Sequence, residues 1–214
     1  KLKLAQEYTK SGYQSYKEGN YSEAIISFEK ANRNYLESNN SLDFTLNNYW
    51  IGNSLFYTNK IYLSIKINNT LSKFCDEKQY KWLLSQSFSR LGFSYSSINK
   101  PSLSLEYGKK SLQLAVDLDD TSAIRRTSSQ IATEYKQIKR FEKSLLYLEK
   151  IMVLPEIELK WADYQSFSEL FFSMKRFETA KLYGRESLLI AQTLEAKDFE
   201  IISNINLGII SGLE

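Results

Sequence analysis

Residues 12–31, GYQSYKEGNYSEAIISFEKA, decide the fold of this chain. The stretch contains a small residue at Gly12, a polar break at residues 18–20 and an aromatic side chain at Tyr21. The residues that share one helical face after the break are spaced four and three apart: Ala24, Phe28 and Ala31. The stretch therefore predicts two amphipathic helices joined by a short turn.

The turn carries a sequence pattern of its own. Asn20, followed three positions later by Glu23, has the spacing of a capping box at the start of the second helix. Similar turns recur along the chain: EGNY at 18–21, TNKI at 58–61, INKP at 98–101, IKRF at 138–141 and MKRF at 174–177. In the third turn, Pro101 falls at the first position of a helix, where a missing N–H costs no hydrogen bond.

The small residue of the first helix recurs with the turns. Its equivalents are separated by 40, 40, 40, 36 and 40 positions: Gly12, Gly52, Gly92, Ala132, Ser168 and Gly208. A small side chain at this position lets two helices cross closely. A period of this length predicts an all-α solenoid of antiparallel helix pairs.

The period also divides the chain. We expect a single solenoid over residues 1–214. Its predicted repeats are residues 1–40, 41–80, 81–120, 121–155 and 156–196, with a partial sixth repeat at 197–212; residues 213–214 are interpreted as a possible vector remnant. The one shorter spacing lacks about one helical turn, so it trims a helix end near Pro155 without rotating the buried face.

Composition limits the function classes. The 214 residues include no His, so His-based acid–base catalysis and imidazole-containing metal sites are excluded. We therefore expect no catalytic residue, no metal site and no cofactor. The net charge of +3 is dispersed over the repeats, which argues against nucleic acid as a partner, and no apolar run is long enough for a membrane span. The single Cys75 leaves the compartment open and favours the cytoplasm.

The opening stretch resembles a tetratricopeptide repeat. The residues that match that pattern in register are Gly12, Tyr21, Ala24, Phe28 and Ala31. The resemblance extends over the whole chain, as five repeats and a sixth first helix, and implies a right-handed superhelix. Its 40-residue period is longer than the usual 34. Such extended repeats are similar to those of bacterial signalling proteins, such as the peptide-regulated Rap-type proteins, and of kinesin light chains.

In that family the first helices of the repeats line a concave groove. Carried over to this sequence, the resemblance implies a ligand groove formed by Lys10, Tyr13, Lys17, Tyr49, Trp50, Asn53, Tyr57, Arg90, Phe93, Arg126, Gln130 and Lys136. Large aromatic residues and Arg are the types that anchor binding hot spots. Two interpretations of the aromatic residues around Trp50 stay open: they contact a ligand, or they pack in the core.

The function that follows is a non-catalytic protein- or peptide-binding module. We expect its partner to be a peptide or protein segment, acidic and with apolar anchors, or the protein's own downstream domain. The alternative is a sensory or regulatory domain of a bacterial signalling protein, such as a kinase, cyclase or transcription regulator, controlled by a peptide or by intramolecular contacts.

The last predicted helix differs from a solenoid cap. Apolar residues lie all around it, whereas a terminal repeat normally has a polar outer face. We therefore expect that the chain is a piece of a larger protein, in which a further helix packs on Gly208 and Ile209.

Overall fold

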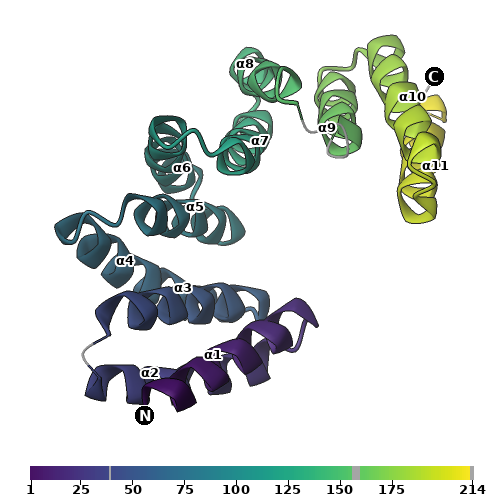
Figure 1. Cartoon of the computed structure of the whole chain (residues 1–214). Coiled ribbons are helices and arrows are strands. Elements are labelled where there is room, and N and C mark those ends of the chain that lie inside the picture. The colour runs from purple at the N-terminus through teal and green to yellow at the C-terminus, as the bar shows by residue number, and fades with distance from the viewer. Residues whose placement is uncertain (39, 156–159, 213–214) are drawn as a thin grey trace. The chain divides into compact units, whose positions relative to one another are not determined.

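The fold is built entirely from helices. The computed structural model describes residues 1–38, 40–155 and 160–212, and within these ranges it contains eleven α-helices and no strand (Figure 1). The helices are α1 (Leu2–Lys17), α2 (Tyr21–Glu37), α3 (Ser41–Tyr57), α4 (Ile61–Glu77), α5 (Lys81–Ser97), α6 (Pro101–Asp117), α7 (Thr121–Gln137), α8 (Phe141–Met152), α9 (Lys160–Ser173), α10 (Phe177–Thr193) and α11 (Lys197–Ser211). The all-α class is confirmed, and α6 begins at Pro101 as predicted.

The helices are arranged as sequential pairs, with odd-numbered A helices each followed by an even-numbered B helix. Most helices have 17 residues, but α8 has 12 and α9 has 14. These two shorter helices lie on either side of the segment where the sequence period is four residues short. The predicted trimming of a helix end therefore falls at α8 and α9.

Contacts group the chain into two compact units, Lys1–Ala123 and Ile124–Glu214. In unit 1 each of the helices α1 to α6 packs on the next one, and the A helices α1, α3 and α5 also contact one another in succession. In unit 2, α9 packs on α8 and α10, and α11 packs on α10 and α9. Each unit therefore has a layer of A helices and a layer of B helices.

The recurring turns end the helices with a residue in the left-handed conformation. Gly19 has φ of +80°, and the non-glycine equivalents Asn59 and Lys139 have φ of 60° and 57°. In the second turn, the N–H of Lys60 donates to the carbonyl of Leu55 at 2.8 Å, which is the long hydrogen bond of a Schellman motif. The recurring turn sequence thus marks the same type of helix C-terminus, with one residue in the left-handed conformation.

The predicted capping box at Asn20 is wrong. Asn20 is the N-cap residue of α2, but its side chain accepts no hydrogen bond from the helix; its Nδ2 instead lies 3.5 Å from Oε2 of Glu18, within the turn. The cap is made at the next pair, where Oδ1 of Asn40 accepts from the N–H of Asp43 at 3.2 Å. Nδ2 of Asn40 donates in return to Oδ2 of Asp43 at 2.7 Å.

Close helix crossings explain the small residues. A Cβ added to Gly12 would lie 2.9 Å from Cδ1 of Phe28, and one added to Gly52 would lie 2.7 Å from Nδ2 of Asn68. Both distances are shorter than a carbon atom tolerates. A residue of the B helix therefore occupies the space that a side chain on the A helix would need.

At the position equivalent to Ala24, other repeats have serine, and the serine hydroxyl joins the two helices of the pair by a hydrogen bond. Oγ of Ser64 donates to the carbonyl of Gly52 at 2.8 Å, and Oγ of Ser144 donates to the carbonyl of Ala132 at 2.8 Å. These hydroxyl groups are buried and fully used by the crossing. In these repeats a hydrogen bond therefore joins the two helices at the position that Ala24 occupies in the first repeat.

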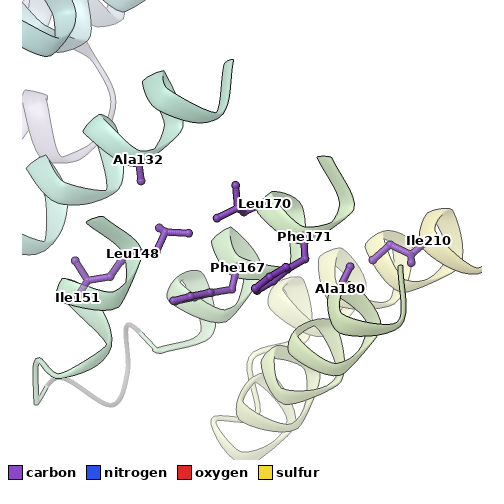
Figure 2. Close-up of a cluster of buried hydrophobic side chains, with 8 residues drawn as sticks. All are labelled: Ala132, Leu148, Ile151, Phe167, Leu170, Phe171, Ala180 and Ile210. Carbon is purple, nitrogen blue, oxygen red and sulfur yellow. The ribbon is translucent and has the colours of Figure 1, made fainter. Parts of the chain in front are cut away.

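The core of unit 2 draws on all of its helices. Figure 2 shows the buried cluster of Ala132, Leu148, Ile151, Phe167, Leu170, Phe171, Ala180 and Ile210. They come from α7, α8, α9, α10 and α11, so a single apolar core joins two consecutive pairs and the following helix α11. Unit 1 has smaller core clusters, around Ala5, Ala24 and Leu71.

Helix α11 exposes much of its apolar surface. Ile201 and Ile205 are each 57% exposed, and Ile209 is 52% exposed. A Cβ added to Gly208 would meet no atom within 4 Å, in contrast to Gly12 and Gly52. The further helix expected over Gly208 and Ile209 stays a prediction.

The crossing at Gly12 can be tested by adding one methyl group. Gly12→Ala should lower the free energy of unfolding by about 1–3 kcal/mol, because the new Cβ overlaps the buried ring of Phe28. Gly208→Ala adds the same group to open space in a helix and should leave stability unchanged or raise it by up to about 1 kcal/mol. Urea unfolding of both variants measures the difference; equal stability of the two would show that the crossing tolerates a side chain.

A second prediction concerns Cys75. The thiol is fully buried, and burial raises its pKa from 9.0 to about 11. Unfolding therefore releases a proton between these pH values, so the free energy of unfolding should fall as pH rises from about 9 to about 11. Alkylation by iodoacetamide should be slow in the folded protein and fast in urea; fast alkylation without denaturant would contradict the burial.

Candidate peptide-binding surface

Three A helices of unit 1 carry most of the predicted groove residues. We call the residues Tyr13, Trp50, Asn53, Tyr57 and Arg90, from α1, α3 and α5, the aromatic–arginine strip. Each of them has a fixed offset from the small residue at the crossing of its own helix. Tyr13 and Asn53 lie one position after that residue, Tyr57 lies five positions after it, and Trp50 and Arg90 lie two positions before it. The crossing holds one side of each A helix against its B helix, and the strip lies on another side.

Ring contacts join α1 to α3. The ring centroids of Tyr13 and Trp50 are 5.1 Å apart in an edge-to-face arrangement, and those of Tyr16 and Trp50 are 5.0 Å apart. Tyr57 stacks on Tyr21 with a centroid distance of 4.7 Å. Such geometries add to the stability that burial of the rings provides. The rings are therefore held in fixed positions.

Arg90 is the central cation of the strip. Its Nε donates to Oδ1 of Asn53 at 2.5 Å, and Asn53 is buried. Its guanidinium carbon lies 4.6 Å from the ring centroid of Phe56 and 5.3 Å from that of Tyr57. Among the hydrogen bonds of the described residues, Arg90 uses only Nε. The two terminal nitrogens, held in a plane by the rings, suit a carboxylate, which guanidinium binds with two parallel hydrogen bonds.

Lysine adds positive charge at α1. Nζ of Lys17 lies 4.6 Å from the ring centroid of Tyr13, and Tyr13 itself is 40% exposed. Lys10 is exposed one helical turn before Tyr13, on the same side of the helix. Phe93, another predicted groove residue, is half-buried with its ring 5.9 Å from the guanidinium of Arg90.

Two of the predicted groove residues belong largely to the core. Tyr49 is only 9% exposed, and its hydroxyl lies within hydrogen-bond distance of Oε1 of Gln86, at 3.4 Å. Trp50 is half-buried and packs against two core clusters of unit 1. Tyr57, which is 49% exposed, is the aromatic side chain of α3 that offers most surface to a ligand.

The remaining predicted residues lie in unit 2. Arg126 is exposed and Gln130 is buried. Lys136 is half-buried, and its Nζ forms an ion pair with Oε2 of Glu169 at 2.6 Å. The contacts within unit 1 therefore bring Asn53, Tyr57 and Phe93 together around Arg90, while Lys136 of unit 2 has an acidic partner of its own.

Arg125 is a buried charge. Arg125 is 6% exposed and forms a buried ion pair with Asp163, which is 3% exposed. Removing one partner of such a pair leaves an uncompensated charge, which is strongly destabilising. The pair joins α7 to α9 and acts in the structure of unit 2.

The structure adds residues to the strip that the sequence analysis missed. Tyr16 and Phe56 lie three positions after Tyr13 and Asn53, the spacing that shares one helical face, so the pattern could have revealed them. Burial, with a contribution from Tyr57, raises the pKa of Tyr16, and this phenol, neutral at pH 7 like that of any tyrosine, adds no charge. The strip is thus positively charged through its cations alone.

Two further properties concern metals and membranes. Across residues 1–38, 40–155 and 160–212, no group of three or more His, Cys, Asp and Glu side chains is placed to hold a metal ion. In the same ranges, no helix combines the length and the apolar character of a membrane span.

Comparison with known proteins gives likeness of structure alone. No protein-family model and no curated protein sequence matches this chain. Among solved structures, aspartyl phosphate phosphatase F from Bacillus subtilis superimposes with a TM-score of 0.83 at 13% identity, over 95% of this chain and 54% of that one. A thermophilic TPR protein from Thermus thermophilus superimposes with a TM-score of 0.66 at 16% identity, over 95% of this chain and 98% of that one. The chain has the tetratricopeptide-repeat fold.

Another of the similar solved structures contains a peptide ligand. The Rap conjugation gene regulator of the plasmid pLS20, in complex with the Phr* peptide, superimposes with a TM-score of 0.76 at 15% identity. The match covers 97% of this chain and 58% of the regulator. The chain thus spans little more than half the length of both the phosphatase and the regulator. The predicted resemblance to Rap-type repeats is confirmed for the fold.

The two interpretations of the aromatic residues can be separated by their effect on stability. Trp50→Ala should lower the free energy of unfolding by about 2–4 kcal/mol, because Trp50 packs on two core clusters. Tyr57→Ala should lower it by only about 1 kcal/mol, because half of that side chain is exposed. Thermal unfolding followed by circular dichroism checks both; a Trp50→Ala variant as stable as the parent would place Trp50 outside the core.

Proposed function

We propose that the chain is a non-catalytic binding module that holds a peptide or protein segment on the aromatic–arginine strip. The observation that carries this proposal is the 49% exposure of Tyr57 beside the guanidinium of Arg90, which Asn53 holds, with Tyr13, 40% exposed, on the neighbouring helix α1. Exposed rings next to an oriented Arg are the composition of a binding hot spot. The fixed geometry supports binding further, because side chains ordered before binding lose less entropy.

The strip suits a ligand of a definite chemistry. Arg90, Lys17 and Lys10 attract negative charge, while the exposed parts of the Tyr13 and Tyr57 side chains offer apolar contact. An acidic segment with at least one large apolar side chain meets both requirements. The charges would steer the ligand and set its register, and the rings would supply most of the affinity.

The likeness to the Rap regulator supports a peptide as the ligand class, since that protein was solved with the Phr* peptide. It also favours a second candidate function, a regulatory domain whose peptide ligand controls a further part of the protein. Small-angle X-ray scattering with and without bound peptide distinguishes the two. A change of scattering on binding supports regulation, and an unchanged curve supports a simple adaptor.

Binding can be tested with fluorescein-labelled peptides and fluorescence anisotropy. A short peptide with glutamates and one Phe should bind, and its versions with Lys for Glu or Ala for Phe should bind at least about tenfold more weakly. The protein variant Tyr57→Ala should bind the unmodified peptide more weakly by roughly 2 kcal/mol, about thirtyfold in Kd. Raising the salt concentration should weaken binding of the acidic peptide, because exposed charges are screened.

A matched pair of charge reversals locates the site. Lys17→Glu should reduce binding of the acidic peptide, because Lys17 lies on the strip beside Tyr13. Lys73→Glu makes the same change on the exposed surface of α4 and should leave binding unchanged. The proposal would be contradicted if Lys17→Glu and Lys73→Glu changed peptide binding to the same extent. It would also be contradicted if the peptide with Lys in place of Glu bound as tightly as the acidic peptide.

A further inference from the structure

A pocket lies between the B helices α2 and α4 of unit 1, with α3 beneath it. Its volume is about 550 Å³, within the range of small-molecule sites. Ile51, Leu55 and Leu71 are buried and form its floor, whereas Glu29 and Lys66 are exposed and stand at its rim. The pocket uses a different face of α3 from the aromatic–arginine strip.

The repeat explains why this pocket exists. In the three later repeats, an aromatic residue of the A helix stacks on a tyrosine of the B helix. The stacked pairs, with centroid distances of 5.4, 5.8 and 5.3 Å, are Tyr95–Tyr107, Tyr135–Tyr147 and Phe171–Tyr183. The same two positions of the second repeat hold Leu55 and Ile67, and both line the pocket.

A third ring is missing in the same place. In the third repeat, Phe88 tilts against Tyr107 with a centroid distance of 5.8 Å. Its equivalent 40 positions earlier is Asn48, which also lines the pocket. Three aromatic positions of the third repeat are therefore smaller side chains in the second. The rings of the third repeat thus pack in part of the space that the pocket occupies in the second.

Asn48 and Thr70 of the pocket wall each use a side-chain donor within their own helix. Nδ2 of Asn48 donates to the carbonyl of Phe44 at 2.9 Å, and Oγ1 of Thr70 donates to the carbonyl of Lys66 at 3.2 Å. The inner wall therefore offers mainly apolar contact. At the rim, the charges of Glu29 and Lys66 are opposite, so they give no preference for a net charge.

We propose that this pocket binds a small, uncharged aromatic molecule, whose ring takes the place of the ring stack that Leu55 and Ile67 do not form. An apolar cavity of this kind holds water poorly and gains contacts from an apolar guest. The enclosure by three helices, with a buried floor, favours a small molecule over a flat protein surface. This site is independent of the aromatic–arginine strip.

The probe for this site is N-phenyl-1-naphthylamine, a neutral aromatic dye that fluoresces in apolar surroundings. Titration of the chain should give a saturable signal for one site. Ile67→Tyr restores one ring of the later repeats, and should weaken dye binding at least about tenfold by filling the pocket. The triple variant Asn48→Phe, Leu55→Tyr, Ile67→Tyr restores all three rings and should abolish binding.

The control variant is Ile26→Tyr, which adds a ring on the exposed surface of α2, outside the pocket. It should leave dye binding unchanged. Circular dichroism checks that each variant folds, and Ile67→Tyr decides the test if the triple variant does not. Acidic-peptide binding at the strip should be the same in all variants, so failure of one site is distinguished from failure of the other.

Three results would overturn the proposal. The first is no saturable dye signal. The second is equal dye binding by Ile67→Tyr and the parent, which would place the dye elsewhere, such as on the exposed isoleucines of α11. The third is a Trp-containing peptide that binds in the pocket while the dye does not, which would make the pocket a docking site for a side chain of a partner protein.

Discussion

The close approach of the two helices at each crossing is the constraint on which the other features depend. Gly12 and Gly52 leave no room for a Cβ, because Phe28 and Asn68 of the facing helices fill that space. Such a crossing fixes both the distance and the rotation of an A helix relative to its B helix. The residue after each small position, such as Tyr13 or Asn53, is then turned by about 100° from the crossing.

The surfaces that we propose for binding lie where the repeat allows variation. The crossing positions are restricted to small residues, but the neighbouring positions change in size and charge from repeat to repeat. On one face of α3, this variation gives the ring and cation arrangement around Arg90 and Asn53. On another face, the change from tyrosine to Ile67 leaves a pocket of about 550 Å³. The two surfaces proposed for recognition thus lie on different faces of one helix of the scaffold.

Periodicity predicted the parts of the structure that recur, and missed those that depend on single side chains. The helix pairs, their turns and the shortened α8 and α9 follow from the spacing of small residues and turn sequences. The cap at Asn20 was wrong because a rotamer choice directs its amide to Glu18. The buried state of Arg125 depends on Asp163, 38 positions away, and no local pattern pairs the two.

The same limit applies to the strip. The side of each A helix was predictable from the family pattern, so Tyr57 and Arg90 were placed on that side from the sequence alone. The burial of each side chain was not predictable in this way. Tyr49 and Trp50 are adjacent in sequence, yet Tyr49 is buried and Trp50 is half-buried. Burial is set by the size of residues on neighbouring helices, which a single-helix pattern does not contain.

The bonds between successive A helices all have a similar span along the chain. Arg90 and Asn53 are 37 positions apart, Arg125 and Asp163 are 38, and Trp161 and Ser203 are 42. Interactions of about one repeat in length give a low contact order, for which folding is fast and can begin at any hairpin. Hydrogen exchange in such a chain proceeds by opening of neighbouring helices in small groups, instead of one global event. A segment can therefore exchange its amides, or be replaced by another repeat during evolution, while distant hairpins keep their structure.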